Sequence, residues 1–163
     1  MFNNMNFTID KNIFTVDNVL LMDSKKNIIM DGAFTKMNYL SEWLTMNGLF
    51  FYMDIDLKSN CNSEKQNIQY DPYTVHNLPT IQFLSNLENL LLDFYLTNKQ
   101  KKSKKNNLFS KQLYTGYLKV TTADNRDKIS SKKQLVVKIS GIWETASEIG
   151  ITYKIFEAGL IAL

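Results

Sequence analysis

The stretch KISGIWETASEIGITYKIF, residues 138–156, predicts two short strands joined by a polar loop. Apolar and polar residues alternate on both sides of the loop, which is typical of strands with one buried and one exposed face. With its flanking residues, the stretch predicts strands at 134–144 and 150–156. Each strand carries a lysine, Lys138 or Lys154, on the face opposite its branched apolar residues. This pair of strands is the starting point for both fold and function.

The length of the chain limits the number of domains. It has 163 residues, of which 44% are hydrophobic. One hydrophobic core fits this length and two ordinary domains do not, so a single domain over residues 1–163 is expected. No run of about 18 apolar residues occurs, and the N-terminal stretch lacks the basic and apolar blocks of a secretory signal. A soluble, intracellular protein without a membrane partner is therefore expected.

Upstream segments also carry the composition or period of strands. Two of them, 12–22 and 28–30, are expected to pair as a hairpin across a polar turn. A second hairpin is expected over 39–53, with its tight turn at Asn47-Gly48. Residues 58–77 hold turn formers and predict a long loop with at most a short extended piece. Further strands are predicted at 33–40, 49–57 and 113–122.

A change of period marks one helix. Apolar residues recur every three or four positions from Ile81 to Phe94, and Pro79 suits a first helical turn, so a helix is predicted over about 79–97. Strands before and after one long helix indicate an α+β fold, mainly antiparallel. The expected architecture is a partly open barrel or twisted sheet, with an oligonucleotide-binding type of barrel among the options, and the helix covering one side.

Charge is distributed unevenly along the chain. Residues 1–98 carry six lysines and eleven acids, a net charge of −5, whereas residues 99–163 carry twelve lysines and Arg126 against five acids, a net charge of +8. Such asymmetry points to a polyanionic partner. An exposed loop is predicted at about 98–107, where five lysines lack an apolar anchor: Lys99, Lys101, Lys102, Lys104 and Lys105.

Strand alternation predicts a basic and aromatic outer surface. If Leu118, Val137 and Ile155 face the core, the residues turned outward include Tyr117, Lys119, Lys138, Lys154 and Phe156. Ammonium groups neutralise phosphates and aromatic rings stack on unpaired bases, so these residues and the lysine-rich loop are candidate contacts for single-stranded nucleic acid. An antiparallel sheet with one solvated face carries the same residue types, which leaves a purely solvated surface as the alternative.

Catalytic and metal-binding patterns are weak. Cys61 and His76 are the only residues of their types, so neither an internal disulfide nor a set of spaced metal ligands is expected. Asp54 and Asp56 share one strand face, but no third acid or base accompanies them in sequence. Among six glycines there is no phosphate-binding loop. A non-enzymatic protein without metal or cofactor is expected.

The two tryptophans are expected in the core. Trp43 lies in the apolar segment YLSEWL, and Trp143 shares strand parity with Ile139 unless Gly141 introduces a bulge.

Two segments carry a family resemblance: DGAFTKMNYLSEWLTMNGLFFYMDI at 31–55 and VVKISGIWETASEIGITYKIF at 136–156. They resemble small uncharacterised proteins of nucleocytoplasmic large DNA viruses, with SGIWE the more specific part and Ile155 a departure from the last pattern. The resemblance extends over most of the chain. It implies an AT-rich viral source and a role in genome handling or virion architecture, in the host cytoplasm, a viral factory or the virion. It supplies no catalytic residues.

Two functional hypotheses follow. The first is non-catalytic binding of single-stranded nucleic acid in genome replication or transcription. The second is a structural or protein-interaction module, such as a minor virion component, in which outward Phe50 and Tyr52 pack against another chain. Self-association through an exposed strand edge is compatible with either.

Overall fold

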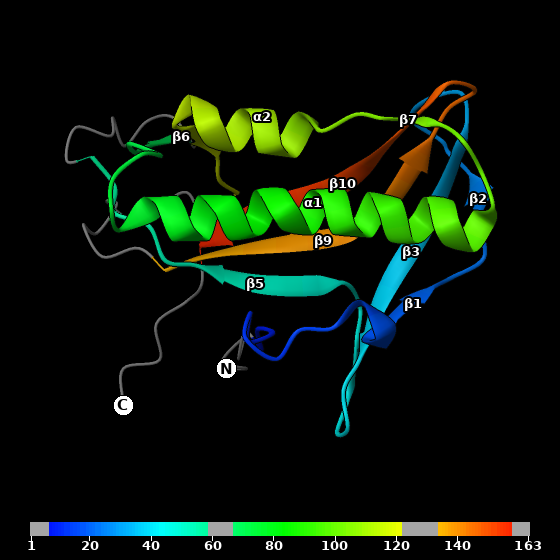
Figure 1. Ribbon diagram of the computed structural model, residues 1–163, viewed down its shortest axis with the longest axis horizontal. Helices are drawn as coiled ribbons and strands as arrows, with labels where there is room; N and C mark the ends of the chain where they lie inside the picture. The colour runs from blue at the N-terminus through cyan, green and yellow to red at the C-terminus, as the bar shows by residue number, and fades with distance from the viewer. Residues whose placement is uncertain (1–6, 59–66, 122–133, 158–163) are drawn as a thin grey trace.

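The computed structural model describes residues 7–58, 67–121 and 134–157. A curled, mostly antiparallel sheet forms a half-barrel, and the long helix α1 (Asn77–Lys99) lies across it (Figure 1). A second helix, α2 (Leu108–Thr115), lies beside α1 (Figure 1). The predicted α+β class is confirmed, and the predicted long helix is present with two more residues at each end.

The main sheet is built around β9 (Leu135–Glu144). One edge of β9 pairs along its length with β10 (Glu148–Glu157). The other edge pairs first with β5 (Leu49–Met53) and then with β3 (Ala33–Leu40). Because two strands share one edge of β9, the sheet opens there and curls around the helix.

Short strands complete the structure. The strands β1 (Val19–Leu21), β2 (Lys25–Lys26) and β4 (Thr45–Met46) pair with β3, and β7 (Lys104–Lys105) pairs in parallel with β10. A separate two-stranded sheet contains β6 (Asn67–Gln69) and β8 (Tyr117–Lys119). The 3-10 turn η1 (Val16–Asn18) precedes β1.

The core lies between the concave face of the sheet and α1. Leu84 and Leu91 of the helix and Val137 and Ile139 of β9 are fully buried. The first turn of α1 is tied to the preceding loop by Asn77, whose side chain accepts from the backbone N–H of Asp56 (2.6 Å) and donates to the carbonyl of Asp71 (2.8 Å). The predicted apolar stripe of the helix therefore faces the sheet.

One extra residue in β9 changes which side chains face the core. Thr152 of β10 pairs with Gly141, but the next residue, Tyr153, pairs with Ile139, so Ser140 is a bulge. Since the side-chain period of a strand is two, the bulge turns Trp143 to the outer face. The prediction that Trp143 lies in the core is wrong for this reason. It is half-buried, and its ring covers Gly150 of the neighbouring strand.

The predicted first hairpin is wrong. Residues 19–21 and 25–26 do not pair with each other and instead pair with different parts of β3, whose eight residues offer a longer edge. Ile28 and Ile29 lie in the turn before β3 and are 98% and 88% exposed. The local alternation of apolar and polar residues predicted extended chain here, but not the strand with which it pairs.

The predicted hairpin across Asn47-Gly48 is also wrong, because β4 pairs with β3 and β5 pairs with β9. β3 and β4 are joined at residues 41–44, where the Ser41 hydroxyl accepts from the backbone N–H of Leu44 (3.1 Å). Asn47-Gly48 instead connects β4 to β5. Trp43 is 88% exposed, which corrects its predicted burial: the hairpin projects from the body at the bottom of Figure 1, where neither helix covers it.

The predicted strand at 113–122 is shorter because α2 occupies its first part. The carboxylate of buried Glu88 in α1 accepts from the backbone N–H groups of Phe109 (3.2 Å) and Ser110 (2.8 Å), which satisfies the first turn of α2. Gly116, at φ 73°, ends the helix before β8. Because the capping carboxylate belongs to another helix, no local sequence pattern predicts the start of α2.

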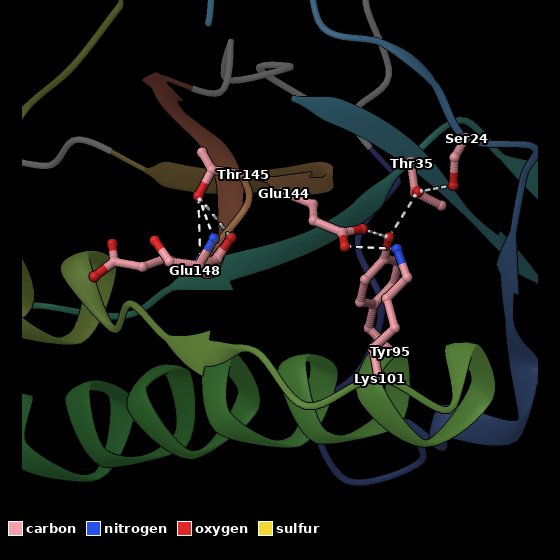
Figure 2. Close-up of polar contacts among 8 residues, drawn as sticks. Ser24, Thr35, Tyr95, Lys101, Glu144, Thr145 and Glu148 are labelled. Carbon is pink, nitrogen blue, oxygen red and sulfur yellow. Dashed lines mark hydrogen bonds and ion pairs between the residues drawn. The ribbon is translucent and has the colours of Figure 1, made fainter. Parts of the chain in front are cut away.

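A polar network joins the C-terminal end of α1 to the sheet (Figure 2). The Tyr95 hydroxyl donates to Glu144 Oε2 (2.8 Å), and Lys101 Nζ donates to Oε1 (2.6 Å). The Thr35 hydroxyl lies 3.3 Å from that of Tyr95 and 2.6 Å from that of Ser24. Tyr95 and Thr35 are almost fully buried, so the network acts as a brace between α1, β3 and β9.

The protonation of this network follows from its geometry. Burial raises the pKa of Tyr95, so its phenol remains a neutral donor. Burial also disfavours the charged form of Glu144, but the hydrogen bonds from Lys101 and Tyr95 outweigh it, and the pKa of the carboxyl is lowered. The hydrogen bond to Glu144 raises the pKa of Lys101. The network therefore holds an ionised carboxylate.

Gly141→Ala is expected to destabilise the fold by about 1–3 kcal/mol, the usual cost of overpacking. An added Cβ would lie 2.3 Å from the carbonyl oxygen of Thr35 on β3. Urea unfolding measures the change. Ala146→Ser, which adds one hydroxyl group in the exposed β9–β10 turn, is the control and should cost less than about 0.5 kcal/mol. Equal stabilities of Gly141→Ala and wild type would contradict the close strand contact.

Glu144→Gln is expected to cost about 1–3 kcal/mol of unfolding free energy near pH 7, because it weakens a charge-assisted pair of hydrogen bonds. The lowered pKa of Glu144 makes this contribution present above the ordinary value of 4.5 and lost as the pH falls through the folded-state pKa. Denaturation at several pH values should show the difference from wild type shrinking below pH 4.5. Glu148 forms a more exposed ion pair with Lys104, at 3.8 Å, so Glu148→Gln should cost less than about 1 kcal/mol of unfolding free energy. A pH-independent difference would contradict the brace.

Candidate nucleic-acid interface

Two ranks of side chains cross the outer face of β5, β9 and β10. In the first, Phe50 pairs with Lys138, which pairs with Lys154. In the second, Tyr52 pairs with Val136, which pairs with Phe156. Neighbouring positions in such a rank are about 5 Å apart. We call this surface the basic-aromatic face; it comprises Phe50, Tyr52, Lys138, Lys154 and Phe156.

Lys119 continues the lysine rank on the far side of β10. The backbone N–H of Thr121 donates to the carbonyl of Ile155 (2.8 Å), and Thr121 forms a parallel bridge with Phe156. Counting back two residues on each parallel segment places Lys119 beside Lys154, and both line one pocket of about 360 Å³. Lys119, Lys154 and Lys138 therefore occupy neighbouring positions, as the alternation of the sequence predicts. We call these three residues the lysine row.

Aromatic rings accompany the lysine row. The rings of Phe50 and Phe156 meet edge to face, with centroids 6.4 Å apart. Lys138 Nζ lies 5.2 Å from the centroid of Phe50, within the range of a cation-π contact. Tyr52 is 45% exposed, and burial, together with the charge of Asp54, raises the pKa of its phenol. The face thus offers a neutral phenol and two half-buried rings next to ammonium groups.

Among the described residues, no ion pair balances the charges of the lysine row. Every lysine in an ion pair between described residues lies elsewhere: Lys101, Lys104 and Lys105. Lys138 and Lys154 stand directly opposite each other, an arrangement of like charges that destabilises a sheet by a few tenths of a kcal/mol. An anion bound between them would relieve this repulsion.

The lysine-rich segment lies away from the lysine row. Lys104 and Lys105 form β7 against the first residues of β10, whereas Lys154 is near the last. Lys101 pairs with Glu144, and Lys105 pairs with Asp93 at 2.8 Å. Helix α1 includes Lys99, and Lys102 is exposed. The structure therefore does not bring this segment together with the strand lysines.

Tyr117 lies two residues before Lys119 on the same exposed face of β8 and is not one of the residues of the basic-aromatic face. It is 60% exposed on β8, and its hydroxyl accepts from the side-chain amide of Gln69 on β6 (2.8 Å). The ring belongs to the small two-stranded sheet.

His76 is not isolated in space. Its Nε2 lies 3.3 Å from Asp54 Oδ1 and 3.8 Å from Asp56 Oδ1. Twenty or more residues separate the histidine from these acids, so sequence spacing gave no sign of the contact. All three side chains are exposed, and within the described ranges no group of three or more His, Cys, Asp or Glu residues is placed to hold a metal ion. Cys61 lies outside the described residues.

Sequence reasoning assigned Phe50 to protein packing and missed its place beside Lys138. It also missed Gln112 and Tyr153, which line the pocket next to the lysine row. The pairing of β5 with β9 joins residues nearly 90 positions apart, which no local pattern reveals.

Neither helix in the described part of the chain is long and apolar enough to cross a membrane. Comparisons with known protein families, with curated proteins and with solved structures found no match.

Proposed function

We propose that this protein binds single-stranded nucleic acid on the basic-aromatic face, together with Lys119, without catalysing a reaction. The observation that carries the proposal is the lysine row itself. Three ammonium groups occupy neighbouring positions without an ion-pair partner among the described residues, and Phe50 and Phe156 lie beside them. Phosphates supply the missing negative charges, and unpaired bases supply flat apolar surfaces for the rings.

The shape of the face favours a single strand. In a duplex the faces of the bases are stacked on neighbouring base pairs, whereas in a single strand they are accessible to aromatic side chains. The two ranks run side by side across the strands, so a bound chain can place phosphates over the lysine row and bases over Tyr52 and Phe156. Lysine recognises phosphate as a point charge, and a ring accepts any base, so binding is expected to tolerate different sequences.

We further propose that this binding serves genome replication or transcription, the role implied by the sequence resemblance of residues 31–55 and 136–156 to proteins of large DNA viruses. The charge of the lysine-rich segment is compensated in part by Glu144, Glu148 and Asp93, so the proposal assigns it no phosphate.

The second candidate function is a protein-interaction module. Exposed aromatic residues favour it: Trp43 at the β3–β4 tip is 88% exposed and Tyr52 is 45% exposed. Docking through apolar side chains depends weakly on salt, whereas release of counterions from phosphates depends on it steeply. The salt dependence of binding therefore separates the two functions.

Three phosphate contacts predict a slope of about −2 when log K for a single-stranded oligonucleotide is plotted against log salt, at about −0.7 per contact. Fluorescence polarisation with a labelled oligothymidylate of about 12 nucleotides measures it. The double variant Lys138→Gln/Lys154→Gln removes two contacts, so the slope should fall to about −0.7 and the affinity should decrease.

Lys25→Gln on β2 and Lys102→Gln in the lysine-rich segment are matched controls, because both lysines are exposed and lie outside the lysine row. Neither should change the slope. Equal losses for all the lysine variants, or a wild-type slope near zero, would contradict the proposed interface.

A further inference from the structure

A pocket of about 360 Å³ lies between β8, the last part of β10 and α2. This volume is at the small end of the range for ligand pockets, roughly 300–1,000 Å³. Lys119 and Lys154 are its exposed basic residues, and Thr121 adds a half-buried hydroxyl-bearing side chain. One side of the pocket therefore belongs to the lysine row.

The remaining lining differs in chemistry. Leu118 and Ile155 also line the pocket, but they are core residues, 3% and 2% exposed, and offer little apolar surface to a ligand. Gln112 of α2 and Tyr153 of β10 supply polar groups that contact each other through the Tyr153 hydroxyl and Gln112 Oε1. The Tyr153 ring is held by Phe109, with ring centroids 4.2 Å apart.

The polar groups of the lining can form hydrogen bonds with a planar heterocycle. Burial, and secondarily the charge of Glu88, raises the pKa of Tyr153 to about 12, so the phenol remains a neutral group that donates and accepts at pH 7. The amide of Gln112 offers both a donor and an acceptor. Two such groups and a pair of ammonium ions match the base and the phosphate of one nucleotide.

We propose that this pocket binds a single phosphorylated nucleotide, with the phosphate at Lys119 and Lys154 and the base directed at Gln112 and Tyr153. The inference rests on the proposed function, because the two lysines are shared with the lysine row. The nucleotide can be the 5′-phosphorylated end of a bound strand or a free mononucleotide, since both present the same chemistry.

Calorimetric titration of the full chain with thymidine 5′-monophosphate, thymidine and inorganic phosphate tests the pocket. The monophosphate should bind at least about tenfold more tightly than thymidine or phosphate. Gln112→Ala removes one hydrogen bond and should therefore weaken monophosphate binding about fivefold or more. Alanine has a high helix propensity, so the substitution suits α2. Tyr153→Phe should weaken monophosphate binding to the same extent without lowering the melting temperature enough to unfold the protein at the titration temperature.

Gln82→Ala on the exposed side of α1 is the matched control and should leave binding unchanged. Lys138→Gln should weaken oligonucleotide binding but not monophosphate binding, because Lys138 does not line the pocket. Oligothymidylates with and without a 5′-phosphate separate the two sources. Tighter binding of the phosphorylated strand assigns the pocket to a strand end, and equal binding with retained monophosphate affinity assigns it to a free nucleotide.

Three results would overturn the inference: no binding of the monophosphate, phosphate binding as tightly as the monophosphate, or wild-type affinity in both Gln112→Ala and Tyr153→Phe. If oligonucleotide binding keeps its steep salt dependence in that case, the pocket assignment fails and the proposed function stands. If neither ligand binds, both fail.

Discussion

The pairing of β9 with three neighbouring strands is the constraint on which the rest of the structure depends. β9 is the only described strand that pairs with β3, β5 and β10. The bulge at Ser140 divides β9 into two parts in which alternate sets of side chains face the core. Before the bulge, Lys138 points outward, opposite Lys154. After it, Glu144 reaches the buried hydroxyl of Tyr95 in α1. One backbone irregularity thus allows the same strand to carry an outer basic row and an inner ionic brace.

The two faces of the sheet have opposite electrostatic characters. On the inner side, two described carboxylates meet partners: half-buried Glu144 is bound by Lys101 and Tyr95, and buried Glu88 is bound by backbone N–H groups of α2. On the outer side, like charges stand next to each other. Buried charges require partners for the fold to form, whereas solvated lysines tolerate a small repulsion. An anionic partner would therefore gain the most binding free energy at the lysine row.

Elements with a strong local period could be predicted from the sequence. The strand at 33–40 and the helix around Leu84 and Leu91 have the expected positions because their apolar residues repeat with one clear period. The final strand pair also has its expected position, although the bulge at Ser140 interrupts its period. Features set by distant contacts could not be predicted. Glu88 caps α2 from another helix, β5 pairs with β9 across the sequence, and the lysine-rich segment finds Glu144 and Asp93 only after folding. The outer lysines were predictable because alternation determines facing even when the partner strand is unknown.

Amide chemical-shift mapping of the ¹⁵N-labelled protein with a single-stranded oligonucleotide tests the central claim most directly, because it locates the bound strand without assuming a contact. The account predicts that the largest changes cluster on the central residues of β5, on β9 before the bulge, and on the last part of β10 with Lys119. Changes concentrated at residues 99–105, or at the exposed β3–β4 tip, would contradict it. So would an unchanged spectrum at saturating oligonucleotide.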